Sequence, residues 1–340
     1  MTAIGGATLD AGRWPALTGS GADRLRAGPW RVAVVGAGGW LGLATLELLH
    51  RLLGDRFARR VASFGSSARA LRLRGGVTVE QRPLAELAAL PPAPTLVLHL
   101  AFLTQEKAKA MAESDYVAAN RDISATVLAA LDRIDAEAVF VPSSGAAYLV
   151  DDDEAQASMR LYGRLKREDE AAFAAWAAVG DRRAAIARVF NLSGPYINKQ
   201  SSYALACFIA DALAGRPIQI RADRPVLRSY VSISDLMSVV FGVLTDRRTG
   251  TVLFDTAGDD IHEMSGIAEA VAAALGDRAG VRRPPLTEAA ADRYVGDGAA
   301  FARLRRAYGV AATDFPSQIL ETARHMAGDD GGPIGRLPAA

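Results

Sequence analysis

The sequence predicts an α/β protein built on a doubly wound, parallel β-sheet with helices on both faces. Three observations support this prediction. A short β-branched run at residues 32–35 enters a glycine-rich turn and then a helical pattern at residues 41–53. Further strand-like runs alternate with helical segments as far as residue 179. Half of the 340 residues are apolar, which is enough to bury a large core.

The first turn has the pattern Gly36-x-x-Gly39-x-x-Gly42, with Trp40 and Leu41 opening the helix. Glycines leave the backbone N–H groups open to a pyrophosphate, and the helix dipole favours negative charge there. A glycine-rich turn between a strand and a helix also occurs without a ligand. Here the strand before the turn and the helix after it are the context that a dinucleotide site needs, so we expect a dinucleotide.

The next strand, expected at residues 60–64, ends where dinucleotide-binding folds select their cofactor. In NAD-binding folds an acidic residue about 20 residues past the glycines binds the ribose 2′-hydroxyl. Positions 62–69 contain no acidic residue, and Ser66, Ser67 and Arg69 stand there instead. Because arginine is a planar multidentate donor that suits a phosphate, these residues favour NADP(H) over NAD(H). A polar surface loop would have the same composition.

Three more strand-like runs complete the predicted sheet, at residues 77–80, 95–100 and 138–141. Helical patterns lie between them at residues 84–90 and 104–135, the second interrupted near Asn120. His99 stands within an apolar strand, so we expect it to have a buried structural role or to face the cofactor.

Ser143 and Ser144 directly follow the last of these strands. Ligands in such sheets bind at the carboxyl ends of the strands, so both serines are candidate site residues. Serines after strands are also ordinary turn residues. The acidic run at residues 151–154 is interpreted as a solvated loop.

Tyr162 and Lys166 are four residues apart in a helix expected over residues 161–179, so they share one helical face. Eight tyrosines and four lysines placed at random would give about 0.1 such pairs, which favours a functional interpretation. An adjacent ammonium favours the ionised phenol, whose unperturbed pKa is near 10. Such a tyrosine can exchange a proton with a sugar or ketone oxygen near neutral pH, while Ser144 holds the same oxygen.

Composition excludes several other classes of protein. Lysine and arginine number 39 against 38 acidic residues, so no overall field attracts nucleic acid or membrane. Cys207 is the only cysteine and the four histidines are widely spaced, which predicts no disulfide and no metal site. Residues 1–29 lack the pattern of a secretion signal, and residues 87–103 are too broken to span a bilayer. We therefore expect a cytoplasmic protein.

Several motifs occur in an order that resembles the extended short-chain dehydrogenase/reductase family of nucleotide-sugar epimerases, dehydratases and reductases. They are the glycine turn, His99-Leu100-Ala101, Ser143-Ser144, Tyr162-x-x-x-Lys166, Arg188-Val-Phe-Asn191-x-x-Gly194-Pro195 and the stretch 228–235. The resemblance covers roughly residues 31–325. It implies a Rossmann domain with a smaller C-terminal α/β cap that binds the substrate.

The resemblance also implies roles for individual residues. The catalytic set is Ser144, Tyr162 and Lys166. The cofactor-binding set is Gly36, Gly39, Trp40, Leu41, Gly42, Ser66, Ser67, Arg69, Leu100, Ala101, Tyr162 and Lys166. The substrate-binding set is Ser143, Asn191 and Arg228, the last two on a nucleotide diphosphate; Asn191 could instead cap a turn, and Arg228 could lie on the surface. Asn120 would support the active-site helices.

The same resemblance divides the chain. Residues 30–190 and 228–257 would form the dinucleotide-binding domain, residues 191–227 and 258–328 the cap, and residues 1–29 and 329–340 two tails. Asp235 is expected to cap a helix that begins at Leu236.

Departures from the family pattern narrow the reaction. Gly145 and Ala146 follow Ser144 where enzymes resembling 4,6-dehydratases carry an Asp-Glu pair, and the glutamate that related decarboxylases use in this loop is also missing. Cys207 is in the wrong segment for a Cys/His base pair. The aspartate that commonly contacts adenine is replaced around Arg82-Pro83. What remains is carbonyl–alcohol chemistry.

We therefore expect an NADP(H)-dependent oxidoreductase that reduces a nucleotide-linked 4-keto-6-deoxysugar. The absent acidic residue and the short interval of 18 residues from Ser144 to Tyr162 favour a reductase. An NAD-dependent nucleotide-sugar 4-epimerase and a non-catalytic dinucleotide sensor are the alternatives. A homodimer through helices near residues 105–133 and 160–179 is implied by the resemblance.

Overall fold

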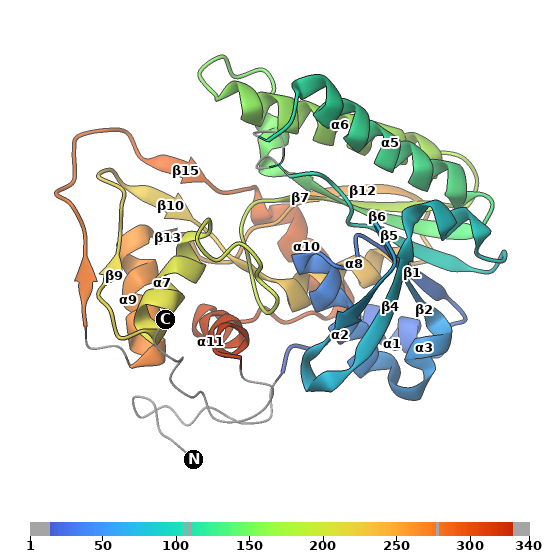
Figure 1. Cartoon of the computed structure of the whole chain (residues 1–340), viewed down its shortest axis with the longest axis horizontal. Coiled ribbons are helices and arrows are strands. Elements are labelled where there is room, and N and C mark those ends of the chain that lie inside the picture. Colours follow the sequence, from blue (N-terminus) through green and yellow to red (C-terminus); the bar gives the residue numbers. More distant parts are fainter. Residues whose placement is uncertain (1–13, 105–106, 108–109, 277–278, 329–340) are drawn as a thin grey trace.

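The computed structural model describes residues 14–104, 107, 110–276 and 279–328. Its main feature is an eight-stranded sheet with the strand order β12-β7-β6-β5-β1-β2-β4-β3 (Figure 1). The strands are β1 (Arg31–Val35), β2 (Val61–Gly65), β3 (Arg69–Arg72), β4 (Thr78–Pro83), β5 (Thr95–His99), β6 (Ala136–Ser144), β7 (Arg183–Val189) and β12 (Gly250–Asp255).

The chain starts in the middle of this sheet and builds outward in both directions. From β1 it proceeds to β2 and β4, then crosses to β5 and continues through β6, β7 and β12. All neighbouring strands are parallel except β3, which pairs antiparallel with β4. The direction in which successive strands are added reverses between β1 and β5. Doubly wound sheets bind ligands at the carboxyl ends of the strands at such a point. The predicted α/β fold class is confirmed.

Alternate residues of β1 face two separate cores, as the period of a strand requires. Val32 and Val34 pack into the core that contains α2 (Trp40–Leu53) and α8 (Ile233–Leu244). Ala33 and Val35 pack into the core under α5 (Glu113–Leu131) and α6 (Ala157–Ala177). Figure 1 shows α5 and α6 together on one side of the sheet. A strand buried on both faces reads as a continuous apolar run, which is how β1 appears in the sequence.

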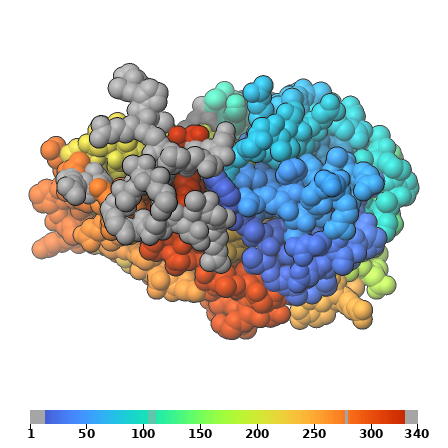
Figure 2. Space-filling model, turned by 90° about the horizontal axis from the view of Figure 1, so that it is seen from below, coloured from blue at the N-terminus to red at the C-terminus, as the bar shows by residue number. Residues whose placement is uncertain are grey.

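Part of the N-terminal segment, which the sequence predicts as a partly ordered tail, forms the helix α1 (Gly19–Ala27). α1 packs against α8 at a glycine contact, because a Cβ atom on Gly21 would collide with the backbone of Gly242. It also contacts α10 (Gly298–Tyr308), and Figure 2 shows the blue N-terminal region beside orange-red C-terminal residues. Residues 1–13 and 329–340, the remainder of the two predicted tails, lie outside the described residues.

The C-terminal part of the chain adds a smaller body beside the sheet. Its three-stranded sheet has the order β13-β10-β15 and packs with α7, α9 and α11 (Figure 1). The elements are α7 (Ala204–Leu213), β10 (Val226–Arg228), β13 (His262–Glu263), α9 (Met264–Leu275), β15 (Asp292–Tyr294) and α11 (Phe315–Met326). Because Phe301 of α10 belongs to the core under the large sheet, the exact limits of the cap stay a prediction.

Short elements connect these parts. The two-stranded sheets pair β8 (Leu192–Ser193) with β11 (Val231–Ser232) and β9 (Ile218–Gln219) with β14 (Val281–Arg282). The remaining elements are the helix α3 (Phe57–Arg60) and the 3₁₀ turns η1 (Gly54–Arg56), η2 (Arg74–Gly76), η3 (Leu84–Ala89) and η4 (Gly145–Leu149). Within the described ranges, no helix has the length and apolar character needed to cross a membrane.

Two local predictions are wrong. α5 is not interrupted near Asn120, because the Asn120 amide donates to the Tyr116 carbonyl within the helix and its Oδ1 accepts from Leu103 N at 2.8 Å. Asp235 does not cap a helix that begins at Leu236. α8 begins at Ile233 with Ser232 as its N-cap, and the Asp235 carboxylate instead accepts two hydrogen bonds from Thr313.

Candidate active site

The glycine turn packs tightly against the residues that follow β5. Gly36 has a φ of 86°, which favours glycine, and a Cβ atom on it would collide with the backbone at Leu100 and Ala101. A Cβ atom on Gly42 would collide with the Gly36 carbonyl. Gly39 is the N-cap of α2, and no side chain caps that helix. The first-turn amides of α2 therefore suit a pyrophosphate, which is the fit that a dinucleotide requires.

Trp40 connects this turn to the segment that follows β8. Its Nε1 donates to the Pro195 carbonyl at 2.8 Å, and its ring lies 5.2 Å from the ring of Tyr203. The segment after Asn191 is therefore fixed to the first turn of α2, next to Leu41.

The end of β2 carries no carboxylate. It ends at Gly65, against which the Gln81 side chain packs, and the Gln81 amide donates to the Ser67 carbonyl at 2.8 Å. Ser66 and Ser67 are exposed. The guanidinium of Arg69, at the start of β3, lies so close to Gly38 that a Cβ atom there would collide with it. The structure thus brings Arg69 to the glycine turn.

Ser144, Tyr162 and Lys166 lie together at the carboxyl end of β6. Ser144 ends the strand, while Tyr162 and Lys166 lie one turn apart on α6. Tyr162 lies near enough to Ser144 for the serine to lower the phenol pKa. Lys166 Nζ lies 5.8 Å from the Tyr162 ring centroid and donates to the Pro142 carbonyl at 3.0 Å. Gly163 allows this approach, because a Cβ atom there would collide with the Ala146 carbonyl.

The electrostatics of this group differ from the sequence-based expectation. Removal from water raises the pKa of Tyr162 above its ordinary value, and nearby Tyr294 adds to the rise, while the Ser144 side chain opposes it. Burial lowers the pKa of Lys166 to about 8, against the opposing effect of Asp169 and Glu170. We expected Lys166 to lower the pKa of Tyr162, but in this structure burial has the larger effect and raises it.

Phe102 is a site neighbour that the sequence reasoning missed. Its ring centroid lies 3.6 Å from Lys166 Nζ and 5.6 Å from the ring of Tyr162, edge to face. Its position directly after His99-Leu100-Ala101 was the signal that could have identified it.

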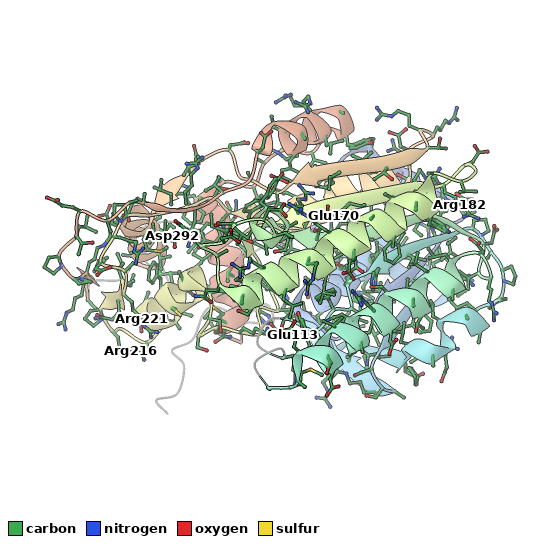
Figure 3. The ribbon with its side chains drawn as sticks, turned by 90° about the horizontal axis from the view of Figure 1, so that it is seen from above. Glu113, Glu170, Arg182, Arg216, Arg221 and Asp292 are labelled. Atoms are coloured by element: carbon green, nitrogen blue, oxygen red, sulfur yellow. The ribbon has the colours of Figure 1, made fainter. Side chains whose placement is uncertain are left out.

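A buried ion pair contacts the end of β6, where Ser143, Ser144 and the following turn η4 form what we call the serine loop. Ser143 Oγ donates to Glu170 Oε1 at 2.5 Å, and Arg188 donates to both oxygens of Glu170 at 2.8 and 2.7 Å. Glu170 lies eight residues after Tyr162 on α6 (Figure 3). Since Ser143 is only 3% exposed and has this internal partner, its geometry favours support of Ser144 over the predicted contact with substrate.

His99 is buried, which agrees with a structural role. His99 Nε2 lies 3.3 Å from Ser124 Oγ, which donates to Asp169 Oδ1 at 2.6 Å. Burial, with a contribution from Lys166, lowers the pKa of His99 to about 3, so its ring is neutral at physiological pH.

The predicted substrate residues Asn191 and Arg228 both contact β15. Asn191 Nδ2 donates to the Tyr294 carbonyl at 3.2 Å, and Arg228 forms an ion pair with Asp292 at 3.1 Å. The Tyr294 hydroxyl lies 3.4 Å from Ser144 Oγ. The fold therefore places these residues beside the serine loop from separate elements.

The protein also has a cavity that does not involve Ser144, Tyr162 or Lys166. A cavity of about 220 Å³ is bounded by residues that include Tyr230, Asp235, His262, Arg305 and Phe315. It includes none of the three catalytic candidates, so the site is identified by its chemistry and its place at the sheet edge. No group of potential metal ligands occurs in the part of the chain that the structure describes.

The model of the NAD dependent epimerase/dehydratase family matches residues 32–253. No curated protein matches this sequence significantly. The family model thus covers the glycine turn, the serine loop and the Tyr162–Lys166 helix, in agreement with the resemblance found in the sequence.

Solved structures show the same fold. A UDP-N-acetylglucosamine 4-epimerase from Methanobrevibacter ruminantium, in complex with UDP-N-acetylmuramic acid, has a TM-score of 0.69 and 17% identity, over 88% of this chain and 98% of that one. The UDP-glucose 4-epimerase of Thermus thermophilus, in complex with NAD, has a TM-score of 0.63 and 21% identity, over 88% and 99%. DesIV, a dTDP-glucose 4,6-dehydratase from Streptomyces venezuelae with NAD and TYD bound, has a TM-score of 0.63 and 19% identity, over 88% and 98%.

Proposed function

Since the chain belongs to the NAD dependent epimerase/dehydratase family of extended short-chain dehydrogenases/reductases, we propose that it is an NADP(H)-dependent oxidoreductase acting on a nucleotide-linked sugar. The reaction is reduction of a keto group, with 4-keto-6-deoxysugars as the first candidates. The observation that carries this proposal is the meeting of Ser144, Tyr162 and Lys166 at the carboxyl edge of the sheet.

Each residue of this group has a distinct role. A bound nicotinamide would supply the hydride. Tyr162 gives its proton to the oxygen of the reduced carbonyl, and its raised pKa favours the protonated phenol that a reduction needs. Ser144 orients the same oxygen, since it lies at the carboxyl end of β6 close to Tyr162. Lys166 places positive charge one helical turn from the phenol and stabilises the tyrosinate left after proton transfer.

The preference for NADP(H) rests on the end of β2. Gly65, Ser66 and Ser67 leave the ribose side without a carboxylate, and Arg69 lies over the glycine turn as a donor for a 2′-phosphate. Asn191 and Arg228 are the proposed contacts for the substrate diphosphate.

A nucleotide-sugar 4-epimerase with tightly held NAD is the second candidate. It is favoured by the fold likeness to two 4-epimerases, of which the Thermus thermophilus enzyme is described as an NAD complex. An epimerase returns the hydride to the same substrate. It would therefore convert substrate with no net change in nicotinamide absorbance.

The proposed assembly is a homodimer. Ala118, Ala125 and Ala129 are exposed on α5, which lies beside α6 on one face of the protein (Figure 3). Small exposed side chains permit close helix packing across a two-fold axis. Sedimentation of the purified protein tests this assembly.

The deciding experiment releases and identifies the cofactor. Purified protein is denatured, any released dinucleotide is identified, and fresh protein is assayed for oxidation of NADPH and NADH with a panel of nucleotide-linked keto-sugars. Oxidation of NADPH with a 4-keto-6-deoxysugar is the expected result. Tightly bound NAD with conversion but no net oxidation supports the epimerase. Failure to bind either dinucleotide contradicts both.

A further inference from the structure

β15 contacts three residues that are predicted to lie at the substrate, namely Ser144, Asn191 and Arg228. The Tyr294 hydroxyl lies near Ser144 Oγ, and the Tyr294 carbonyl accepts from Asn191. Asp292 pairs with Arg228. A short strand of the cap therefore binds side chains that a substrate would need as hydrogen-bond partners.

The contact between Arg228 and Asp292 has the geometry of a phosphate contact. Arg228 Nη1 donates to Asp292 Oδ1 at 3.2 Å and to the Asp292 carbonyl at 3.0 Å, while Nη2 donates to Oδ2 at 3.1 Å. Two parallel N–H···O bonds from one guanidinium are also how arginine binds a phosphate group. The Asp292 carboxylate and a substrate phosphate cannot hold this pair of nitrogens at the same time.

Asp292 is the more exposed partner. Its side chain is 50% exposed, whereas that of Arg228 is 18% exposed. β15 is an edge strand, preceded by exposed residues 284–291, while Arg228 lies in the central strand and also donates to the Leu227 carbonyl. The Asp292 carboxylate can therefore leave Arg228 without disturbing a core, while the Asp292 backbone stays paired with β10.

We propose that Asp292 competes with the substrate diphosphate for Arg228 and so sets the affinity for the nucleotide. This inference rests on the proposed function, in which the substrate is nucleotide-linked. The negative charge of Asp292 weakens binding of the diphosphate. Removing that charge frees the guanidinium for the phosphate.

The test is calorimetric titration of the full chain with UDP and with dTDP. Asp292→Asn should bind at least one of them about fivefold more tightly than the parent protein, the size expected for removing a half-exposed competitor from an ion pair. Asp292→Glu keeps the carboxylate and should stay weak. The gain should disappear when Arg228→Ala is added to Asp292→Asn.

Asp211→Asn is the matched control, because Asp211 pairs with Arg216, which Figure 3 shows away from Asp292. It should leave both affinities unchanged. Asp292→Ser replaces Asp292→Asn if the latter does not fold, as judged by thermal unfolding.

Unchanged or weaker binding by Asp292→Asn, or by Asp292→Ser where it replaces Asp292→Asn, overturns the proposal. A gain that persists without Arg228, or an absence of binding in every variant, also overturns it. Dinucleotide binding is measured on the same preparations. Its failure counts against the proposed function, whereas normal dinucleotide binding with no effect at Asp292 counts against this inference alone.

Discussion

The Glu170 carboxylate and the Arg188 guanidinium form a two-pronged ion pair beneath the serine loop, with N···O distances of 2.8 and 2.7 Å. Removing one partner of a buried pair leaves the other charge uncompensated. Glu170→Ala should therefore lower the free energy of unfolding by about 3 kcal/mol, measured in urea. Glu168→Ala is the matched control, because Glu168 pairs with Arg121 at the surface and should cost under about 1 kcal/mol. Equal losses would contradict the supporting role of Glu170.

Tyr162→Phe should keep dinucleotide affinity and lose about 10²–10⁴-fold in turnover, because it removes the hydroxyl group that transfers the proton and keeps the ring. Steady-state rates and dinucleotide titration measure the two effects. Tyr308→Phe serves as the control, since the Tyr308 hydroxyl donates to Asp246 away from the site. Near-normal turnover in Tyr162→Phe would refute the assignment.

Arg69→Ala should raise the KM for NADPH about tenfold and leave the KM for NADH nearly unchanged, because only the former carries the 2′-phosphate. Assays with both cofactors at fixed substrate concentration measure this ratio. Equal changes for NADPH and NADH would show that Arg69 does not select the cofactor. Arg72→Ala, at the other end of β3, is the control.

Glu321→Gln should stabilise the protein above pH 7 and have little effect below pH 4.5. Burial, aided by Asp235, raises the pKa of Glu321 to about 7 from an ordinary value of 4.5. The folded protein therefore holds this proton where the unfolded chain has lost it, so stability falls as the pH rises from about 4.5 to about 7. At pH 8.5 the variant should gain about 2 kcal/mol in urea unfolding. The exposed Glu269→Gln should show no such pH dependence.

Gly21→Ala should destabilise the protein by about 2 kcal/mol, because the added methyl group would force α1 away from Gly242. Gly266→Ala, in a helix with open space around it, should instead be neutral or stabilising by about 0.5 kcal/mol. Thermal and urea unfolding compare the two. A neutral Gly21→Ala would mean that α1 does not dock at this contact.

Secondary structure and the catalytic candidates were predictable from the sequence where the local residue pattern and the side-chain chemistry agree. A buried parallel strand, a glycine turn and a helix leave a strong pattern, as at residues 32–53, because backbone conformation and burial repeat at fixed periods. The spacing of Tyr162 and Lys166 placed both on one helical face for the same reason. The fold class and the family followed from such patterns, whereas the site roles remain predictions.

Partner choice across the chain was decided only by tertiary structure. Nothing near Asp292 in the sequence indicates Arg228, and nothing near Gly21 indicates Gly242, because such contacts depend on how distant elements pack. The same holds for Asp235, which accepts hydrogen bonds from Thr313 rather than capping a helix. Local sequence determined the strands, the helices and the chemistry of the catalytic candidates. Packing determined which partner each charged side chain has, because a charge removed from water is stable only beside a partner, and tertiary structure decides which residues lie next to it.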